Sequence, residues 1–411
     1  GEEEGKDIHP AVTASTGIAA THIGGLTIHS WCGIGIKDTL TSRDLSDIVS
    51  NKRIVGRIKK AEVLIIDEIS MLSAKTFTAV DKVCRAVRKS NVPFAEDKSK
   101  LPFGGLQVVL VGDFFQLPPV TRRVEVSNEQ TFFPDEDENT TPFAFSSPAW
   151  RELDPTVCYL IEQHRQEDAV LLNALNAIRS NVVDDITRDC LAGRIVSVLP
   201  KETITKLFPH NANVDRINEV ELAKLTTQKR SFAMHSRGAP PLIESLIRNC
   251  LSPESLVLKV GAKVMFTKNH PEGRYVNGTL GEVIGFDKEE GQPIVKTRAG
   301  KTIVVEVSEW GIQDGEKILA AIDQYPLRLA WAITVHKSQG MSLDAAVIDL
   351  RQAFEYGQGY VALSRVRTLD GLYLLGFNAR ALEVHPTVSE QDARFREASA
   401  LACRQLTRSS S

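Results

Sequence analysis

The chain carries at residues 64–70 the stretch Leu64-Ile65-Ile66-Asp67-Glu68-Ile69-Ser70, in which a short apolar run ends in two adjacent carboxylates. Such a run is typical of a strand buried on both faces of a parallel sheet. Phosphoryl hydrolysis at a metal requires this pair, since Asp67 can hold Mg²⁺ and Glu68 can orient and deprotonate the attacking water. An ordinary strand end with exposed acids explains the pair too, so the interpretation depends on neighbouring motifs.

The pattern of an apolar run, a polar turn and a helix recurs along the chain. Val108–Val111 leads into Gly112 and Asp113, and similar runs occupy Ala345–Ile348 and Leu372–Leu375. This alternation predicts an α/β fold with parallel sheets and with ligands at the carboxyl ends of strands. Between the first two runs we expect an amphipathic helix with an apolar stripe of Phe77, Val80, Val83, Cys84 and Val87.

Composition narrows the class of protein. The chain has 411 residues, enough for two or more domains, and its 42% hydrophobic and 25% charged residues are those of a soluble globular protein. Because the net charge is −3, any nucleic-acid contact must come from local basic surface. The six cysteines are scattered without a C-x-x-C pair, which favours reduced intracellular thiols over disulfides or zinc. No apolar run is long enough to predict a membrane span.

Three further motifs carry candidate chemistry. In Val111–Pro119, Gln116 can sense a γ-phosphate through its amide, whereas a proline-rich turn leaves Asp113 and Gln116 unexplained. Small hydroxyl residues at Thr13–Ala20 suit a phosphate, although a plain helix cap explains them equally. The loop Thr334–Gly340 suits a nucleic-acid backbone or a nucleotide phosphate.

Two arginines are candidates for stabilising a transferred phosphoryl group. Arg365 follows a short apolar helix within Gly359–Arg367, and Arg165 lies in the run Gln163–Gln166. Arginine fingers act in this way across a domain cleft. An isolated arginine is more often part of a surface ion pair, so these two assignments depend on the other motifs.

In this order the motifs resemble those of the Pif (petite integration frequency) family of superfamily-one DNA helicases, close kin of RecD-like helicases. The resemblance is carried by T-A-S-T-G-I-A-A with T-I-H-S, D-E-I-S-M, G-D-F-F-Q-L-P-P, Q-H-R-Q, T-V-H-K-S-Q-G and Y-V-A-L-S-R-V-R. It extends from Ala11 to Phe377, and the segment Ser70–Asn91 is similar to the family's stretch between its second and third motifs.

The resemblance implies an α/β fold of two RecA-like P-loop NTPase domains with parallel sheets and with ATP between them. The first domain would span residues 1–150, with a wedge element at about 33–59. The second would span 151–254 and 319–411, and would contain a small SH3-like β-barrel insertion at 255–318, where short β-rich runs are split by glycine-containing turns.

The resemblance also implies an ATP-dependent DNA helicase with ATP and Mg²⁺ as cofactors. The family moves 5′ to 3′ on single-stranded DNA and unwinds forked duplexes, DNA–RNA hybrids and G-quadruplexes. We expect a monomer that acts in genome maintenance (replication, repair, recombination, telomeres), without a membrane partner. The expected location is intracellular: the nucleus or mitochondrion in a eukaryote, the cytoplasm in a bacterium.

Site residues carry over by motif position. The implied catalytic residues are Glu68, Gln116, Arg165 and Arg365. Mg²⁺ would be held by Asp67, and ATP by Asp67, Asp113, Gln339, Gly340 and Gly359. The implied DNA contacts are Thr13, Ser15, Thr16, His29, Thr334, His336 and Lys337.

One family motif, the phosphate-binding loop G-x-x-x-x-G-K-[S/T], does not occur before Ala11. Gly5-Lys6 is not that loop, because Asp7 replaces the hydroxyl residue and three nearby glutamates would repel phosphate. We expect either a fragment of a working helicase or a catalytically dead pseudo-helicase that binds nucleic acid, and the other catalytic groups favour the fragment. A non-enzymatic binding or scaffold protein would show DNA affinity that is indifferent to nucleotide. A RecD-like exonuclease subunit or relaxase module is a minor alternative.

Overall fold

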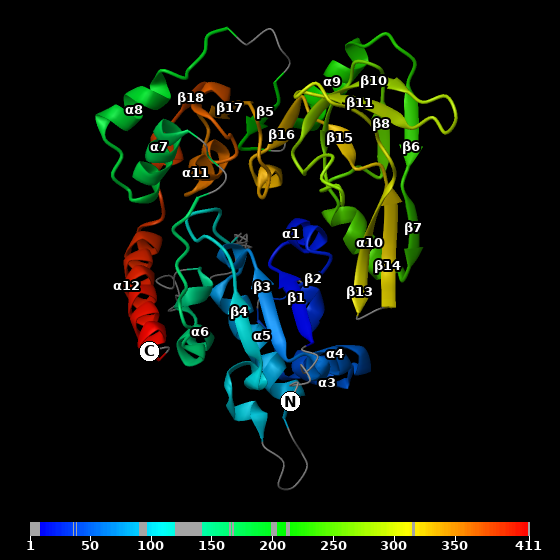
Figure 1. The fold of residues 1–411 in the computed structure, drawn as a ribbon. Helices are drawn as coiled ribbons and strands as arrows, with labels where there is room; N and C mark the ends of the chain where they lie inside the picture. The colour runs from blue at the N-terminus through cyan, green and yellow to red at the C-terminus, as the bar shows by residue number, and fades with distance from the viewer. Residues whose placement is uncertain are drawn as a thin grey trace, which may run out of the picture. The chain divides into compact units, whose positions relative to one another are not determined.

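The computed structural model describes residues 9–35, 37, 39–89, 97–119, 142–163, 166, 168–198, 204–210, 214–314 and 317–409. The chain forms two compact units (Figure 1). The first unit comprises Gly1–Phe114, Pro118–Tyr159 and Ala393–Ser411; the second comprises Phe115–Leu117 and Leu160–Asp392. This grouping differs from the predicted domains, since residues 393–411 belong with the first unit and Phe115–Leu117 with the second.

A parallel sheet of four strands forms the centre of the first unit. Its strand order is β2-β1-β3-β4, and every pair is parallel. The strands are β1 (Pro10–Ala14), β2 (Leu26–Thr27), β3 (Val63–Asp67) and β4 (Gln107–Leu110). The two apolar runs predicted as parallel strands are therefore neighbours, and Asp67 is the last residue of β3.

Helices surround this sheet. They are α1 (Gly17–His22), α2 (Ile28–Cys32), α3 (Ser42–Ser50), α4 (Lys52–Lys60), α5 (Ala74–Val87) and α6 (Pro148–Leu153), with 3₁₀ turns at Ile69–Met71, Lys98–Lys100, Pro102–Gly105 and Ala144–Ser146. The expected amphipathic helix is α5, and all five residues of its predicted stripe are buried. The range 33–59 holds most of the helix pair α3–α4, and its role as a wedge stays a prediction.

The last helix, α12 (Pro386–Ser409), packs on the first unit through an aromatic cluster. The ring of Phe395 lies 5.9 Å from Phe114, 6.1 Å from Phe145 and 6.0 Å from Trp150, measured between ring centroids. Ser399 Oγ accepts a hydrogen bond from the backbone N–H of Tyr159 at 3.0 Å. Burial of these rings explains why residues 393–411 belong with the first unit.

The second unit contains another parallel sheet, with strand order β16-β5-β17-β18. Its strands are β5 (Lys206–Phe208), β16 (Ala332–Thr334), β17 (Ala346–Leu350) and β18 (Leu372–Phe377). The helices of this unit are α7 (Ala169–Arg179), α8 (Asp185–Ala192), α9 (Val214–Lys224), α10 (Pro240–Asn249) and α11 (Gln358–Leu363), with 3₁₀ turns at His336–Ser338, Leu369–Gly371 and Ala379–Leu382.

Antiparallel strands fill the middle of the second unit. A five-stranded sheet has the order β12-β11-β10-β9-β15, a three-stranded sheet the order β13-β14-β7, and β6 pairs with β8. These strands are β6 (Arg230–Ala233), β7 (His235–Gly238), β8 (Ser255–Leu258), β9 (Lys263–Phe266), β10 (Leu280–Phe286), β11 (Pro293–Thr297), β12 (Thr302–Val304), β13 (Ser308–Asp314), β14 (Lys317–Gln324) and β15 (Leu327–Leu329). The β-rich region therefore extends beyond the predicted 255–318 at both ends, and the SH3-like assignment stays a prediction.

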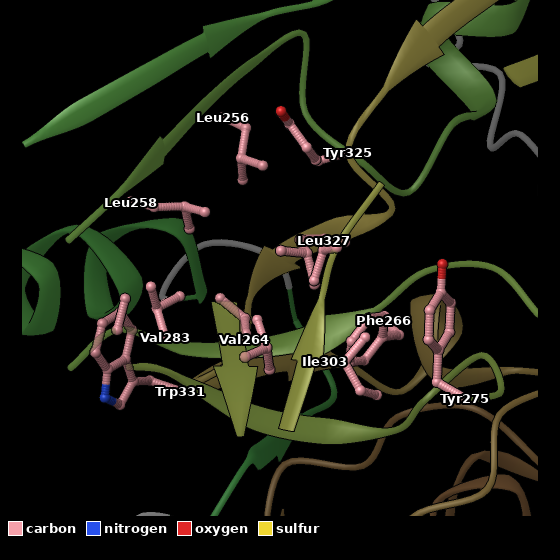
Figure 2. Packing of buried hydrophobic residues seen from close by; sticks show 13 residues of the cluster. Leu256, Leu258, Val264, Phe266, Tyr275, Val283, Ile303, Tyr325, Leu327 and Trp331 are labelled. Atoms are coloured by element: carbon pink, nitrogen blue, oxygen red, sulfur yellow. The ribbon is translucent and has the colours of Figure 1, made fainter. Parts of the chain in front are cut away.

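A hydrophobic cluster joins the five-stranded sheet to β8 (Figure 2). Leu256 and Leu258 from β8, Val264 and Phe266 from β9, and Leu327 from β15 are fully buried in it. Side chains from strands on both sides of the predicted insertion share one core, which explains why the region exceeds the predicted bounds.

Candidate functional site

The two carboxylates at the end of β3 lie at a sharp change of backbone direction. Asp67 Oδ1 accepts a hydrogen bond from the backbone N–H of Glu68 at 2.8 Å. Glu68 has φ 52° and ψ 46°, in the left-handed region that non-glycine residues seldom adopt. The turn is held because the N–H of Ile69 donates to the carbonyl of Val111 at 3.0 Å. A strained backbone at a catalytic candidate is typical of functional sites.

The segment after β1 supports this turn. Ser15 donates from its backbone N–H to the carbonyl of Asp67 at 3.0 Å, and from its hydroxyl to the carbonyl of Glu68 at 2.6 Å. The hydroxyl of Thr13 donates to the carbonyl of Ile65 at 2.7 Å. Thr13 and Ser15 are both buried. Their hydroxyls hold β1 to the end of β3, and the DNA contacts predicted for both residues stay predictions.

Thr16 and His29 are partly exposed. Thr16 Oγ1 accepts a hydrogen bond from the N–H of Ala19 at 3.3 Å, so Thr16 caps the start of α1. This geometry is that of the plain helix cap considered for this motif. The DNA contact predicted for the two residues stays a prediction.

The end of β4 approaches the same turn. A Cβ at Gly112 would lie 2.9 Å from the backbone nitrogen of Ile69, so only glycine permits this contact between the two strand ends. Asp113 follows directly and is partly exposed. The predicted metal ligand, base and third acidic residue thus come from adjacent carboxyl ends of one parallel sheet.

In the second unit, Gln116 lies beside Gln339. The Nε2 of Gln339 donates to the Oε1 of Gln116 at 3.3 Å. The preceding residue is Phe115, and the guanidinium carbon of Arg179 lies over its ring, 4.5 Å from the ring centroid. Gly357 allows this approach, because a Cβ there would lie 2.5 Å from the carbonyl oxygen of Phe115. Two residues predicted to read the nucleotide are therefore brought together.

The loop 334–340 divides into buried and accessible residues. Thr334 is buried, and its Oγ1 accepts a hydrogen bond from the N–H of Lys337 at 3.3 Å. The DNA contact predicted for Thr334 stays a prediction. His336 is partly exposed, with Nε2 at 3.6 Å from Oε2 of Glu355. Gly340 is exposed at φ 77°, a conformation that favours glycine.

Lys337 carries positive charge in a partly buried place. Burial lowers its pKa, the neighbouring charge of Arg328 lowers it further, and Asp215 opposes both effects. Burial likewise lowers the pKa of Arg328, whose Nε has no hydrogen-bond partner among the described residues. Two cations that share one carboxylate, partly out of water, favour an anion such as a phosphate.

Arg365 is fully buried. Its guanidinium donates to the carbonyl of Val361 at 2.8 Å and to the hydroxyl of Ser364 at 2.7 Å. Packing also requires glycine at position 359, because a Cβ there would lie 1.9 Å from the carbonyl oxygen of Ala381. The nucleotide roles of both stay predictions. Arg165 lies outside the described residues.

An exposed pair of rings was not singled out in the sequence. Phe354 follows β17 and His210 follows β5, and their rings stack with centroids 4.8 Å apart and planes 15° apart. The two residues are 144 positions apart (354 minus 210), so no local motif indicates the pair.

The chemistry of the donors fits Mg²⁺ bound with a nucleotide. Within the described ranges, no group of three or more His, Cys, Asp or Glu side chains could hold a metal. Mg²⁺ at a nucleotide needs only one or two protein carboxylates, because phosphates and water supply the other ligands. Asp67 meets this requirement. No helix in the described part of the chain is long and apolar enough to cross a membrane.

Two parallel-sheet units with these motifs define a P-loop NTPase of the RecA-like class. A family model described as PIF1-like helicase matches residues 4–182, and one for the 2B domain of DNA helicase Pif1 matches residues 241–286. An ATP-dependent DNA helicase Pif1 from Psychrobacter sp. is 42% identical over 95% of this chain, and one from Bdellovibrio bacteriovorus is 35% identical over 92%. The chain belongs to the Pif1-like helicase family.

Solved structures agree. Bacteroides sp. Pif1 in complex with ADP-AlF4 matches with a TM-score of 0.78 and 30% identity, over 96% of this chain and 89% of that one. The chain spans 64% of the length of the Psychrobacter relative and 80% of the Bdellovibrio relative.

Proposed function

We propose that this chain is the motor region of an ATP-dependent DNA helicase, with Mg²⁺ and ATP as cofactors and single-stranded or forked DNA as partner. The observation that carries the proposal is the Asp67-Glu68 turn, held by Ser15 at the carboxyl end of a parallel sheet. Related proteins support it: Bacteroides Pif1 has been solved with ADP-AlF3 and single-stranded DNA, and Pif1 helicases at forked duplex DNA.

Each residue would have a simple task in hydrolysis. Bound Mg²⁺ supplies charge neutralisation at the phosphates, and Asp67 would hold it. Glu68 would orient a water and accept its proton. Gln116 and Gln339, joined at 3.3 Å, would donate to the terminal phosphate. Arg365 and Arg165 would stabilise the charge that develops there.

The DNA contacts would be made by partly exposed residues. Lys337, with Arg328 beside it, would bind a backbone phosphate, because their charges exceed that of Asp215. His336 in the second unit, and His29 and Thr16 in the first, would each contact DNA. Thr13, Ser15 and Thr334 are buried, and the DNA contacts that the family resemblance implies for them stay predictions.

The finer features follow the family resemblance. We propose movement 5′ to 3′, action on DNA–RNA hybrids and G-quadruplexes as well as forks, and a role in genome maintenance. The working form would be a monomer in an intracellular compartment. Unwinding of fluorescent forks with a 5′ or a 3′ tail measures the direction.

The decisive experiment extends the chain at its N-terminus with the first strand and G-x-x-x-x-G-K-[S/T] loop of a Pif1 relative. Without the extension we expect little phosphate release, because the 411 residues lack that loop. With it, single-stranded DNA should stimulate ATP hydrolysis. Glu68→Gln should reduce turnover at least 100-fold, if its loss resembles that of other general bases.

The matched control is Glu62→Gln, an exposed glutamate just before β3. Turnover of this variant should stay near that of the extended parent. An extended chain that folds and binds DNA but stays inert would overturn the motor assignment in favour of a pseudo-helicase. DNA affinity that is indifferent to ATP analogues would point to a binding module.

A further inference from the structure

Phe354 exposes an aromatic surface that the proposed reaction does not use. Its side chain is 55% exposed, and among the described residues no other phenylalanine or tryptophan is exposed. Exposing this much of a phenylalanine costs stabilisation that burial would provide. One side of the ring is stacked by His210, and His210 is itself exposed.

The pair is held in place by buried polar contacts. Gln358 is fully buried, its Oε1 accepts the N–H of Phe354 at 3.2 Å, and its Nε2 donates to the carbonyl of Pro209 at 3.4 Å. One side chain thus links the segments that carry the two rings. Asn378 Nδ2 also donates to the carbonyl of Ala353 at 2.8 Å. The rings are therefore preorganised, which reduces the entropic cost of binding a flat ligand.

The pair adjoins the loop proposed to bind the DNA backbone. Phe208, at the end of β5, accepts the N–H of Val335 at 3.0 Å, and Glu355 lies 3.6 Å from His336. The ends of β5, β16 and β17 therefore meet at one edge of the second parallel sheet (Figure 1). That edge carries the stacked rings and the loop that contains His336 and Lys337.

We propose that Phe354, backed by His210, is a stacking platform for one base of single-stranded DNA. The inference rests on the proposed function and assigns a base-contacting residue within it. Every base has a flat face that an aromatic ring can stack on, and stacking is sequence-tolerant. Bases in a duplex are covered by their neighbours, so the platform selects unpaired DNA. The adenine of ATP has the same chemistry, and the test separates the two.

The test measures single-stranded DNA binding by the 411-residue chain. Phe354→Leu keeps an apolar side chain but removes the ring, and should weaken binding about tenfold. Phe354→Tyr should bind like the parent. The matched control is Ile186→Ser, which alters another exposed apolar side chain of the same unit. The salt dependence should stay unchanged in Phe354→Leu, because stacking releases no counterions.

A direct readout comes from Phe354→Trp. Stacking of a base should quench the fluorescence of the new indole, relative to the parent, and an oligonucleotide of abasic sites should not. Equal DNA affinity of Phe354→Leu and the parent, or no quenching, overturns the platform while the helicase proposal stands. Weaker binding of a fluorescent ADP but not of DNA reassigns the ring to the nucleotide and also overturns it. Failure of the parent to bind DNA contradicts the proposed function itself.

Discussion

Ser15 shows how a buried hydroxyl can act through a neighbour at the residue scale. Its Oγ donates to the carbonyl of Glu68 at 2.6 Å, and Glu68 occupies a left-handed conformation that needs support. The sequence motif suggested a phosphate or DNA contact for this hydroxyl. We infer a positioning role from its burial and its hydrogen bond to the backbone of Glu68.

We predict that Ser15→Ala loosens the turn at Glu68. One buried hydrogen bond contributes about 1 kcal/mol, so the amides of Ser15 and Ile69 should exchange with solvent several-fold faster. In the extended chain, DNA-stimulated turnover should fall as well. Ser50→Ala is the control, since Ser50 donates to a carbonyl at 2.8 Å on an exposed helix. Unchanged exchange and turnover in Ser15→Ala would contradict the positioning role.

At the scale of elements, α5 shows how much of the packing of a helix its sequence pattern predicts. Its apolar stripe was predictable, because the residues recur at helical spacing, and all of them are buried. Phe77 is fully buried and lies 5.1 Å from Phe103 and 5.8 Å from Trp150, measured between ring centroids. The partners of this ring come from distant segments, so their identity did not follow from periodicity.

We predict that Phe77→Ala destabilises the first unit by about 3–5 kcal/mol, through lost burial and a residual cavity. Urea unfolding followed by tryptophan emission measures this change, since Trp150 is in the same cluster. Lys82→Ala, at an exposed position of the same helix, should change stability by less than about 0.5 kcal/mol. Equal free energies of unfolding for the two variants would show that burial of Phe77 does not stabilise the first unit.

The strands differ in whether the local sequence alone predicts them. β3, β4, β17 and β18 were expected from uninterrupted Val, Ile and Leu runs, which is typical of parallel strands. β6, β7 and β15 were not, because they are short and pair with strands far along the chain. The exposed Phe354–His210 pair was missed for the same reason: proximity of the ends of β5 and β17 arises only in the folded sheet.

At the scale of the whole molecule, the net charge of the chain does not indicate the charge of its proposed DNA-binding surface. The chain carries −3 overall, yet the positive charge of Arg328 in β15 acts on Lys337 in the loop 334–340. DNA affinity should therefore depend on a few contacts and on salt. Family and α/β fold could be inferred from ordered motifs, whereas the buried roles of Thr13 and Thr334 required coordinates.

We predict that Lys337→Gln weakens single-stranded DNA binding and reduces the slope of log affinity against log salt by about 0.7, the value for one phosphate contact. Fluorescence anisotropy at several salt concentrations measures it. Lys224→Gln is the control, since the charge of Lys224 is paired with Glu221 at 2.7 Å. An unchanged slope in Lys337→Gln would remove this residue from the backbone contact.

The packing of α12 has a consequence for the order in which the protein can mature. Phe395 completes the aromatic cluster of the first unit, but it leaves the ribosome after every residue of the second unit. The second unit can thus fold without Phe395, whereas the first must wait for it with Phe114, Phe145 and Trp150 incompletely covered. A released chain that is truncated before Ala393 should hold a folded second unit and a first unit that chaperones still recognise.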